Sequence, residues 1–332
     1  GGHCAGHDHT GSRAPLYSEG GPELGVNALA NAELPVPLIP GTLAQDRDSE
    51  RARLFRETPS QAAMRWIMGT AYACQPRRVG NLPYLWWWTL ADLARGGTRI
   101  PDQARTHPRP DTFAGVARGI CPETILAAAR RGFFPWCHFG PLKWWTRENR
   151  FVLFSGEQHI PKRLAREMRK TGRRVTFDQA FDEVVKACAG HRPGRPTGLT
   201  WVTPQIMRLY SELFDLGHAH SFEVWGEDGR LIGGGYGLSV GRVFYGESQF
   251  SWESNTSKMG FVTLNHHLAK WGYVLCDGKD FTEVIGSMGF RPIPRAEFEA
   301  ILAEHGQGGD KPAPWVVEDD LATIASGTSS KR

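Results

Sequence analysis

Cysteine is scarce in this chain and its spacing is uninformative. Six cysteines stand among 332 residues, and no two of them form a Cys-x-x-Cys motif. This usage predicts reduced thiols rather than a disulfide scaffold, and therefore a cytoplasmic protein. Long apolar runs are also missing: no window approaches the about 18 consecutive apolar residues of a membrane-spanning helix. We therefore expect no membrane partner.

Several catalytic signatures are absent as well. The sequence contains no Gly-x-x-x-x-Gly-Lys-Ser/Thr phosphate loop, which argues against a nucleoside triphosphatase. It contains no Gly-x-Ser-x-Gly nucleophile turn and no His-Glu-x-x-His zinc motif. No metal site is expected.

The chain does carry a small excess of positive charge and many tryptophans. The 39 Lys and Arg outnumber the 35 Asp and Glu, for a formal net charge of +4. Twelve tryptophans are present, with clusters at 86–88 and 144–145. Clustered tryptophans are typical of core packing. The length suggests about two domains.

Composition divides the chain into five segments. Residues 1–50 are rich in Gly and Pro without an apolar period, which predicts a disordered lead. Residues 51–110 predict a partly helical N-terminal extension, with one helix beginning at Pro59 after a Thr58 cap. We expect a small domain over 111–155, a larger domain over 156–305 and a C-terminal tail over 306–332.

The larger domain shows a mixed pattern of helices and strands. Helices are predicted at 177–190 and 203–216, followed by period-two strands at 219–225, 231–240 and 243–250. A helix over 258–271 then leads to a strand over 273–277. This order predicts an α+β fold, with a meander followed by a helix and a further strand, as in GNAT-type acyltransferases. Fold alone does not define function.

The strongest charge signal is a predicted helix over 159–174. It carries seven cations and one acid, Glu167, and the cations are Lys162, Arg163, Arg166, Arg169, Lys170, Arg173 and Arg174. This local density predicts contact with an anionic polymer, nucleic acid above all.

Several short runs together resemble one family. They stand in order over residues 111–318 and comprise Arg131–Trp136, Trp144-Trp145, Thr200–Thr203, Leu216–Ser221, Glu223–Trp225, Tyr236-Gly237, Gly246–Ser251, Ser257-Lys258 and Ile293–Arg295. Each run alone is weak, but the ordered series with kept spacing is specific. The chain resembles the bacterial leucyl/phenylalanyl-tRNA–protein transferases.

The resemblance implies a small N-terminal family domain packed on a GNAT-like domain. It implies transfer of an amino acid from aminoacyl-tRNA, the co-substrate, to the α-amine of a peptide that begins with Arg or Lys. No metal or other cofactor is implied, because the ester on tRNA is already activated. We expect the enzyme to act as a monomer that positions the amine, removes a proton and stabilises an oxyanion.

The resemblance also implies site residues. Asp277 would orient the amine or receive its proton, and Glu247 would help to hold the amine. Trp144, Trp145 and Trp201 would frame the terminal adenosine of the tRNA by stacking. The seven cations of residues 159–174, the basic segment, would hold the acceptor-stem phosphates.

Three positions depart from the family pattern. Lys279 stands where the family has a catalytic Gln, so it would disfavour protonation of the acceptor amine or recruit an acidic acceptor. Gly235 and Gln249 replace two methionines that line the family's Leu/Phe pocket, beside Tyr236 and Phe250. The Gly would make room and the Gln would add hydrogen-bonding groups, which predicts a preference for a larger or more polar amino acid than Leu.

Other functions remain open at this point. The acceptor would be a peptide N-terminus or a small molecule of specialised metabolism. An acyl-CoA-dependent GNAT enzyme is a second reading, although its pyrophosphate loop has only a poor candidate in residues 195–200. A catalytically silent RNA-binding relative is a third, motivated by Lys279.

Overall fold

The computed structural model describes residues 42–108, 112–138, 140–190 and 199–327. Contacts divide the chain into two units, residues 1–52 and residues 53–332, and both sheets lie in the second. Helix α1, Thr42–Leu54, begins inside the segment predicted as a disordered lead, so the lead does not extend to residue 50. Residues 1–41 of that segment lie outside the described residues. No helix in the described ranges is long and apolar enough to cross a membrane.

The N-terminal extension is helical. It contains α2 (Pro59–Ala73), α3 (Pro76–Val79), α4 (Leu82–Ala94) and a 3-10 turn at Gln103–Arg105. The predicted start of α2 is confirmed. The Thr58 side chain accepts a hydrogen bond from the Gln61 amide, and the Gln61 side chain accepts one from the Thr58 amide. This reciprocal cap fixes the first turn of the helix.

Helix α4 overturns the core-packing prediction for two of its tryptophans. Trp86 and Trp87 are 60% and 68% exposed. Only Trp88 turns inward, where it stacks on His107 at a ring distance of 3.6 Å and packs against the core of the small sheet. Helix α4 therefore carries apolar side chains both on the face that packs against the small sheet and on the exposed face.

The small sheet has the strand order β1-β3-β2. Its strands are β1 (Phe113–Val116), β2 (Phe134–Trp136) and β3 (Lys143–Trp145), and helix α5 (Pro122–Ala129) lies between β1 and β2 in sequence. Both strand pairs are antiparallel, and Phe134 pairs with Trp145. Phe113, Val116, Phe134 and Trp145 form its core.

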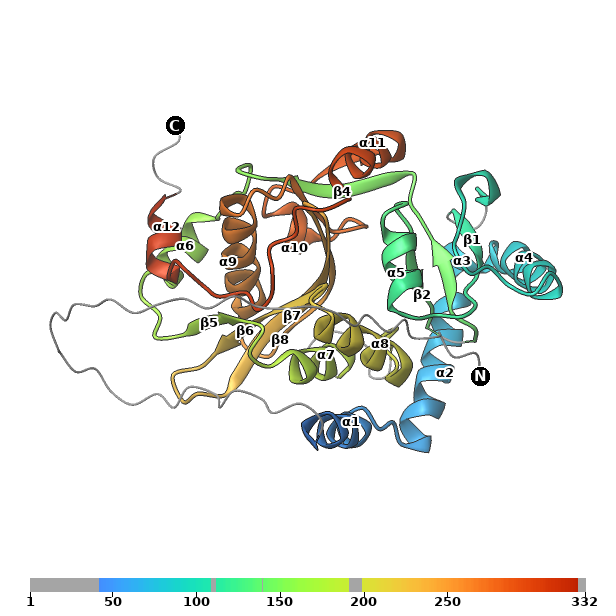
Figure 1. The fold of residues 1–332 in the computed structure, drawn as a ribbon, viewed down its shortest axis with the longest axis horizontal. Coiled ribbons are helices and arrows are strands. Elements are labelled where there is room, and N and C mark those ends of the chain that lie inside the picture. The colour runs from blue at the N-terminus through green and yellow to red at the C-terminus, as the bar shows by residue number, and fades with distance from the viewer. Residues whose placement is uncertain (1–41, 109–111, 139, 191–198, 328–332) are drawn as a thin grey trace, which may run out of the picture. The chain divides into compact units, whose positions relative to one another are not determined.

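The large sheet has seven strands in the order β10-β4-β9-β8-β7-β6-β5 (Figure 1). They are β4 (Asn149–Phe154), β5 (Arg174–Phe177), β6 (Ala219–Trp225), β7 (Leu231–Val240), β8 (Val243–Ser251), β9 (Leu275–Asp277) and β10 (Arg291–Pro294). Neighbours are antiparallel except β8 and β9, which run parallel. The predicted meander over 219–250 is confirmed. Strand β4 joins this sheet, although it was assigned to the small domain.

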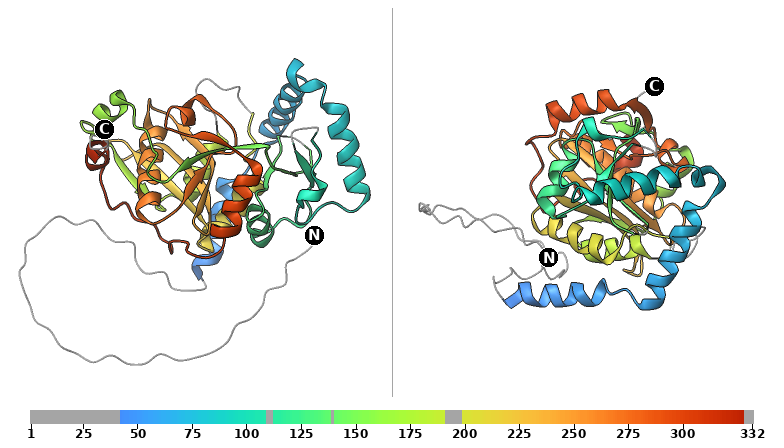
Figure 2. Two further views of the ribbon diagram at one scale, coloured as in Figure 1. Left: turned by 90° about the horizontal axis from the view of Figure 1, so that it is seen from above. Right: turned by 90° about the vertical axis from the view of Figure 1, so that its right-hand side faces the viewer.

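Helices cover both faces of the large sheet (Figures 1 and 2). They are α6 (Lys162–Met168), α7 (Phe181–Ala189), α8 (Pro204–Asp215), α9 (Thr256–Lys270), α10 (Glu283–Gly286), α11 (Arg295–His305) and α12 (Leu321–Gly327). One core packs α7 and α8 through Val184, Leu209 and Tyr210. The other packs α6 and α9 through Leu164 and Met259. The mixed α+β class is thereby confirmed.

The segment predicted as a C-terminal tail is packed onto the sheet. Trp315 is 1% exposed and stacks on His220 of β6 at 3.6 Å with an angle of 4°. Its backbone amide donates to Asp178 at 2.8 Å. Leu321 and Ile324 of α12 are buried in the core shared with α6. The tail prediction is therefore wrong up to residue 327, where the description ends.

Glu223 gives the fold a pH dependence. Its side chain is buried between β5 and β6, where it accepts hydrogen bonds from Thr176 and Ser221 at 2.5 Å each. Burial raises the pKa of this carboxyl to about 7 against the opposing effect of these bonds. In the unfolded chain the group ionises near its ordinary pKa of about 4.3, so the protein loses stability as pH rises from there to about 7.

We expect Glu223→Gln to remove this loss. The melting temperature of the variant relative to the native chain should rise between about pH 5 and about pH 8, because only the native chain must ionise a buried acid. Thermal unfolding monitored by circular dichroism at both pH values measures the difference. A gap that does not change with pH would contradict the assignment.

Candidate active site

A β-bulge presents the central acidic side chain of the site. Tyr236 pairs with Ser248 and Gly237 pairs with Gly246, so Glu247 is the extra residue on β8. Bulges interrupt the ladder and re-aim a side chain, often next to active sites. The Glu247 side chain is 3% exposed and lines two cavities. We call the one beside the large sheet the sheet cavity and the one against the N-terminal extension the extension cavity.

The sheet opens beside this bulge. Strand β9 runs parallel to β8 as far as the pair Tyr245 and Asp277, and the chain then turns away at Gly278 and Lys279. Lys279 has a φ of 65°, a left-handed conformation that is uncommon for a residue with a side chain. Its Nζ donates to the Gly246 carbonyl at 3.0 Å and to Glu247 Oε2 at 2.5 Å. The predicted catalytic pair Glu247 and Lys279 is thus in direct contact.

A buried ion pair supports the turn. Arg150 and Asp277 are both fully buried, and the guanidinium donates to both carboxylate oxygens, with Nε to Oδ1 at 3.1 Å. Burial alone would lower the pKa of Arg150, but the Asp277 charge and hydrogen bonds raise it above its ordinary value. Asp277 Oδ1 also accepts from the Lys279 backbone amide at 3.0 Å. Both oxygens of the Asp277 carboxylate are therefore hydrogen-bonded within the protein, and the residue lines neither cavity.

The sheet cavity has a volume of about 220 Å³. Its walls include the apolar side chains Phe222, Phe244, Phe261 and Ile285, and the predicted residues Tyr236 and Gln249 also line it. Within the described part of the chain, the buried Gln249 Oε1 has no hydrogen-bond partner.

Two residues predicted for this pocket do not line it. Phe250 is 1% exposed and is buried in the core that packs α7 and α8. Gly235 does not make room, because a Cβ there would lie 2.7 Å from the Phe222 ring. The space that a larger side chain would take at 235 is filled by Phe222, a residue that was not predicted for the site.

The extension cavity has a volume of about 310 Å³ and continues from Glu247. One wall comes from the small sheet and the loop after β9, with Phe134, Trp136, Trp145 and Lys279. The facing wall belongs to the extension and comprises Gly69, Tyr72 and Ala73 of α2, Arg78 of α3, Asn81, and Leu82 and Leu85 of α4. Trp201, His138, Gly246, Glu247, Gly278 and Thr282 line both cavities, which therefore adjoin.

The structure separates the three tryptophans predicted to frame a nucleotide. Trp144 has no exposed surface, and its indole donates to the Thr98 carbonyl at 3.0 Å, so it is a core residue and the prediction for it is wrong. Trp145 is 6% exposed and lines the extension cavity. Trp201 is half-buried at the junction of both cavities. Trp136 also lines the extension cavity. It was not predicted for the site, although it ends the run Arg131–Trp136 that resembles the family.

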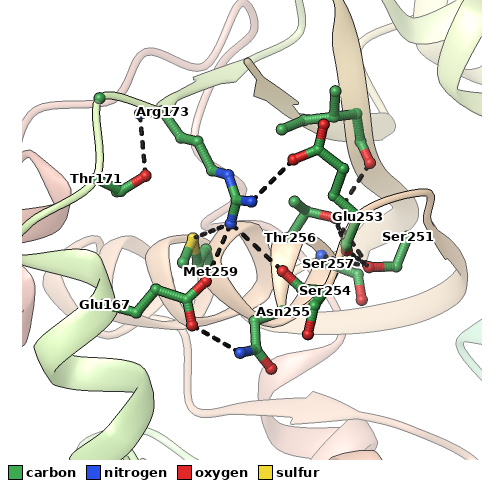
Figure 3. Close-up of polar contacts among 12 residues, drawn as sticks. Glu167, Thr171, Arg173, Ser251, Glu253, Ser254, Asn255, Thr256, Ser257 and Met259 are labelled. Carbon is green, nitrogen blue, oxygen red and sulfur yellow. Dashed lines mark hydrogen bonds and ion pairs between the residues drawn. The ribbon is translucent and has the colours of Figure 1, made fainter. Parts of the chain in front are cut away.

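The basic segment is shorter as a helix than predicted. Helix α6 ends at Met168, and Arg174 already begins β5. Arg173 is bound by Glu167 at 3.1 Å and by Glu253 at 2.8 Å (Figure 3). A shallow depression here is lined by the cations Arg163, Arg166, Lys170 and Arg173 together with the acids Glu167, Glu227, Asp228 and Glu253.

These acids change the interpretation of the basic segment. Three of the four come from distant parts of the sequence, and together the four acids lie beside four of the seven cations of the run. The segment also lies with α12 at the end of the large sheet away from α5 and β2 (Figures 1 and 2). Arg169 donates to the Ala325 carbonyl of α12 at 3.1 Å.

Two further residues at the site carried no sequence signal. Arg150 meets Asp277 across 127 positions, so no local pattern marks the pair. Tyr210 of α8 is fully buried, and burial together with the nearby Glu247 charge raises the pKa of its hydroxyl well above the ordinary value. Cys276, next to Asp277, is buried, and burial raises the pKa of its thiol well above the ordinary value.

Two other expectations concern ligands. Over the ranges that the structure describes, no group of three or more metal-binding side chains comes together. The candidate pyrophosphate loop of an acyl-CoA enzyme, residues 195–200, falls mostly on residues 191–198, which lie outside the described residues.

Comparison with known proteins agrees with this architecture. The family model for leucyl/phenylalanyl-tRNA protein transferase matches residues 152–303, and the model for the N-terminal domain of that family matches residues 119–148. Proteins named leucyl/phenylalanyl-tRNA–protein transferase are similar over most of their length. The one from Pseudomonas syringae pv. syringae is 42% identical over 65% of this chain and 93% of its own. The one from Stutzerimonas stutzeri is 42% identical over 65% and 95%, and that from Thiobacillus denitrificans is 41% identical over 63% and 91%.

The bulged acid, the opened sheet and the two adjoining cavities thus belong to an aminoacyltransferase. The chain is a member of the leucyl/phenylalanyl-tRNA–protein transferase family. Helices α2, α3 and α4 precede the residues that the two family models match.

Proposed function

We propose that the protein transfers an aminoacyl group from charged tRNA to the free amine of an acceptor. The amine nitrogen attacks the ester carbonyl, an amide bond forms and the bond to the ribose oxygen breaks. The proton that the amine loses ends on that oxygen, which leaves as the hydroxyl of the tRNA. The observation that carries this proposal is the meeting of two cavities at Glu247, which Lys279 contacts. One cavity takes the aminoacyl side chain and the other takes the tRNA end.

The walls of the cavities support this division. The sheet cavity is small, and its walls combine apolar rings with polar side chains such as Gln249, which suits an amino-acid side chain. The extension cavity is lined by Phe134, Trp136, Trp145 and Trp201, and aromatic rings of this kind stack single-stranded bases at about 1–3 kcal/mol per base.

We assign the proton transfer to Glu247. It is the one carboxylate among the described residues that lines both cavities, and its Oε1 is left free by the Lys279 ammonium, which bonds Oε2. The Lys279 ammonium also supplies a cation near the carbonyl oxygen, where negative charge develops. Asp277 acts as a positioning residue, because Arg150 and the Lys279 amide occupy it.

The architecture supports a GNAT-like assignment for the large domain. A single parallel pair, β8 and β9, interrupts an otherwise antiparallel sheet and parts at the site. The substrate favours the cytoplasm, where charged tRNA occurs.

Incubation with a pool of charged tRNAs tests the proposal. Candidate acceptors, comprising peptides with different first residues and small amines, are analysed by mass spectrometry for the added aminoacyl mass. We expect a product that disappears when the tRNA is digested with RNase beforehand. Tight tRNA binding without any product would instead favour a catalytically silent RNA-binding protein.

Gln249 predicts the aminoacyl preference. Its buried Oε1 lacks a partner in the described residues, and a substrate side chain with a hydrogen-bond donor would satisfy it. We therefore infer a preference for a polar aminoacyl group.

Gln249→Met should shift this preference toward Leu and Phe. The change removes the polar group and leaves the volume of the side chain similar, so the ratio of kcat/KM for Leu over the polar substrate should rise by about tenfold or more. Competition between differently charged tRNAs measures this ratio. Efficient use of Leu and Phe by the native chain, with no use of polar residues, would refute the inference.

A further inference from the structure

The extension contributes a wall to the site that the family models do not include. Tyr72 of α2 and Arg78 of α3 line the extension cavity opposite Trp136, and both precede residue 119, where the matched region begins. The cavity is about 310 Å³ in volume and continues to Glu247. The two residues therefore face the same space as the proposed reaction centre.

The wall combines an aromatic ring with a cation. The Arg78 guanidinium lies over the Tyr72 ring at 4.1 Å. The same ring meets His138 edge-on at 4.9 Å and Trp136 at 6.5 Å. Both Tyr72 and Arg78 are half-buried, so they are held in place and still reachable from the cavity.

Charge distinguishes the possible ligands of this wall. In the described part of the chain, Arg78 takes part in no ion pair, whereas the acids of the cavity are already bound: Glu247 by Lys279 and Asp280 by Arg147 at 2.7 Å. Lys143 is a further buried cation of the lining. A cationic acceptor side chain would meet repulsion here, whereas a phosphate would find an unpaired guanidinium.

We propose that Tyr72 and Arg78 form a nucleotide subsite for the tRNA strand just before its terminal adenosine. The proposal rests on the proposed function, which places the aminoacyl ester at Glu247. Arginine stacks on aromatic faces and binds phosphate through its N–H fork, so the pair fits a base and the phosphate attached to it. The extension thereby lengthens the contact with RNA beyond the terminal nucleotide.

Two donors of different length test the subsite. Transfer is measured with charged tRNA and with aminoacyl-adenosine, which lacks every preceding nucleotide, for the native chain, Arg78→Ala and Tyr72→Ala. We expect each variant to raise KM for charged tRNA by on the order of tenfold, the loss of one stacked or phosphate-bound nucleotide, and to leave aminoacyl-adenosine unaffected. Arg77→Ala is the matched control, because Arg77 is exposed on the same helix and does not line the cavity.

Binding supplies a readout that does not need activity. The affinity for an uncharged RNA oligonucleotide ending in CCA should fall by a similar factor in Arg78→Ala, and its dependence on salt should weaken by about one phosphate contact. Equal losses with both donors, or a raised KM for the acceptor alone, would overturn the proposal, the latter in favour of acceptor binding. If the native chain transfers nothing from any donor while the oligonucleotide effect persists, the proposed function fails and the subsite stands.

Discussion

Asp277→Asn is expected to lower the free energy of unfolding by about 3–5 kcal/mol, because it leaves the fully buried Arg150 without its counter-charge. Transfer should fall as well, since the neutral side chain no longer holds the Arg150 guanidinium through both oxygens, although its Oδ1 still accepts from the Lys279 amide. Denaturant unfolding measures the first effect and single-turnover transfer the second. Asp280→Asn is the matched control: its pair with Arg147 is 58% exposed at the acid and should contribute under about 1 kcal/mol.

A double variant separates the structural role from the positioning role. Arg150→Met combined with Asp277→Leu removes both charges, and apolar replacements of a buried pair are often neutral for stability. We expect most of the lost stability to return while transfer is lost, because the anchor of the Lys279 amide is now missing. A stable double variant with native transfer rates would show that Asp277 does not position the site. A cost for Asp277→Asn as small as that of the control would contradict the buried pair itself.

Glu247→Gln is expected to reduce kcat by about 10²–10⁴-fold, the usual contribution of a general base. The amide keeps the shape of the carboxylate and a contact to Lys279, but it cannot accept the amine proton. KM for charged tRNA should change little, because the bulge and both cavities remain. Single-turnover kinetics with saturating enzyme measures the chemical step.

The control for this variant is Glu297→Gln, an exposed glutamate of α11 that lines neither cavity. It should transfer at the native rate. A loss below tenfold in Glu247→Gln would mean that the amine arrives already neutral and that Glu247 holds it rather than deprotonates it.

Local patterns were sufficient where the cause of the structure is local. The meander follows from period-two alternation and short turns, and α8 follows from its Thr203 cap and apolar stripe, so both appear as predicted. The family resemblance, rather than a local pattern, pointed to Glu247 and Lys279, which the structure brings into contact.

What sequence could not give depends on partners distant along the chain. Three of the acids beside the basic segment come from later turns, so the run of cations looked unopposed. The space at Gly235 is taken by Phe222 of a neighbouring strand. Trp144 and Trp145 are adjacent in a strand, so their side chains point to opposite faces, and only one reaches a cavity. The bulge at Glu247 is set by the register of two strands rather than by composition.

The parallel pair of β8 and β9 has a consequence for synthesis of the protein. Strands β6, β7 and β8 follow one another directly, so they can form while the rest of the chain is still being made. Asp277 lies 127 positions after Arg150, and α9 must be completed before β9 can reach its place between β8 and β4. A nascent chain that has not passed Lys279 therefore lacks both the anchor and the cation of the site. The proposed reaction centre is therefore completed late in synthesis, after most strands of the large sheet have been made.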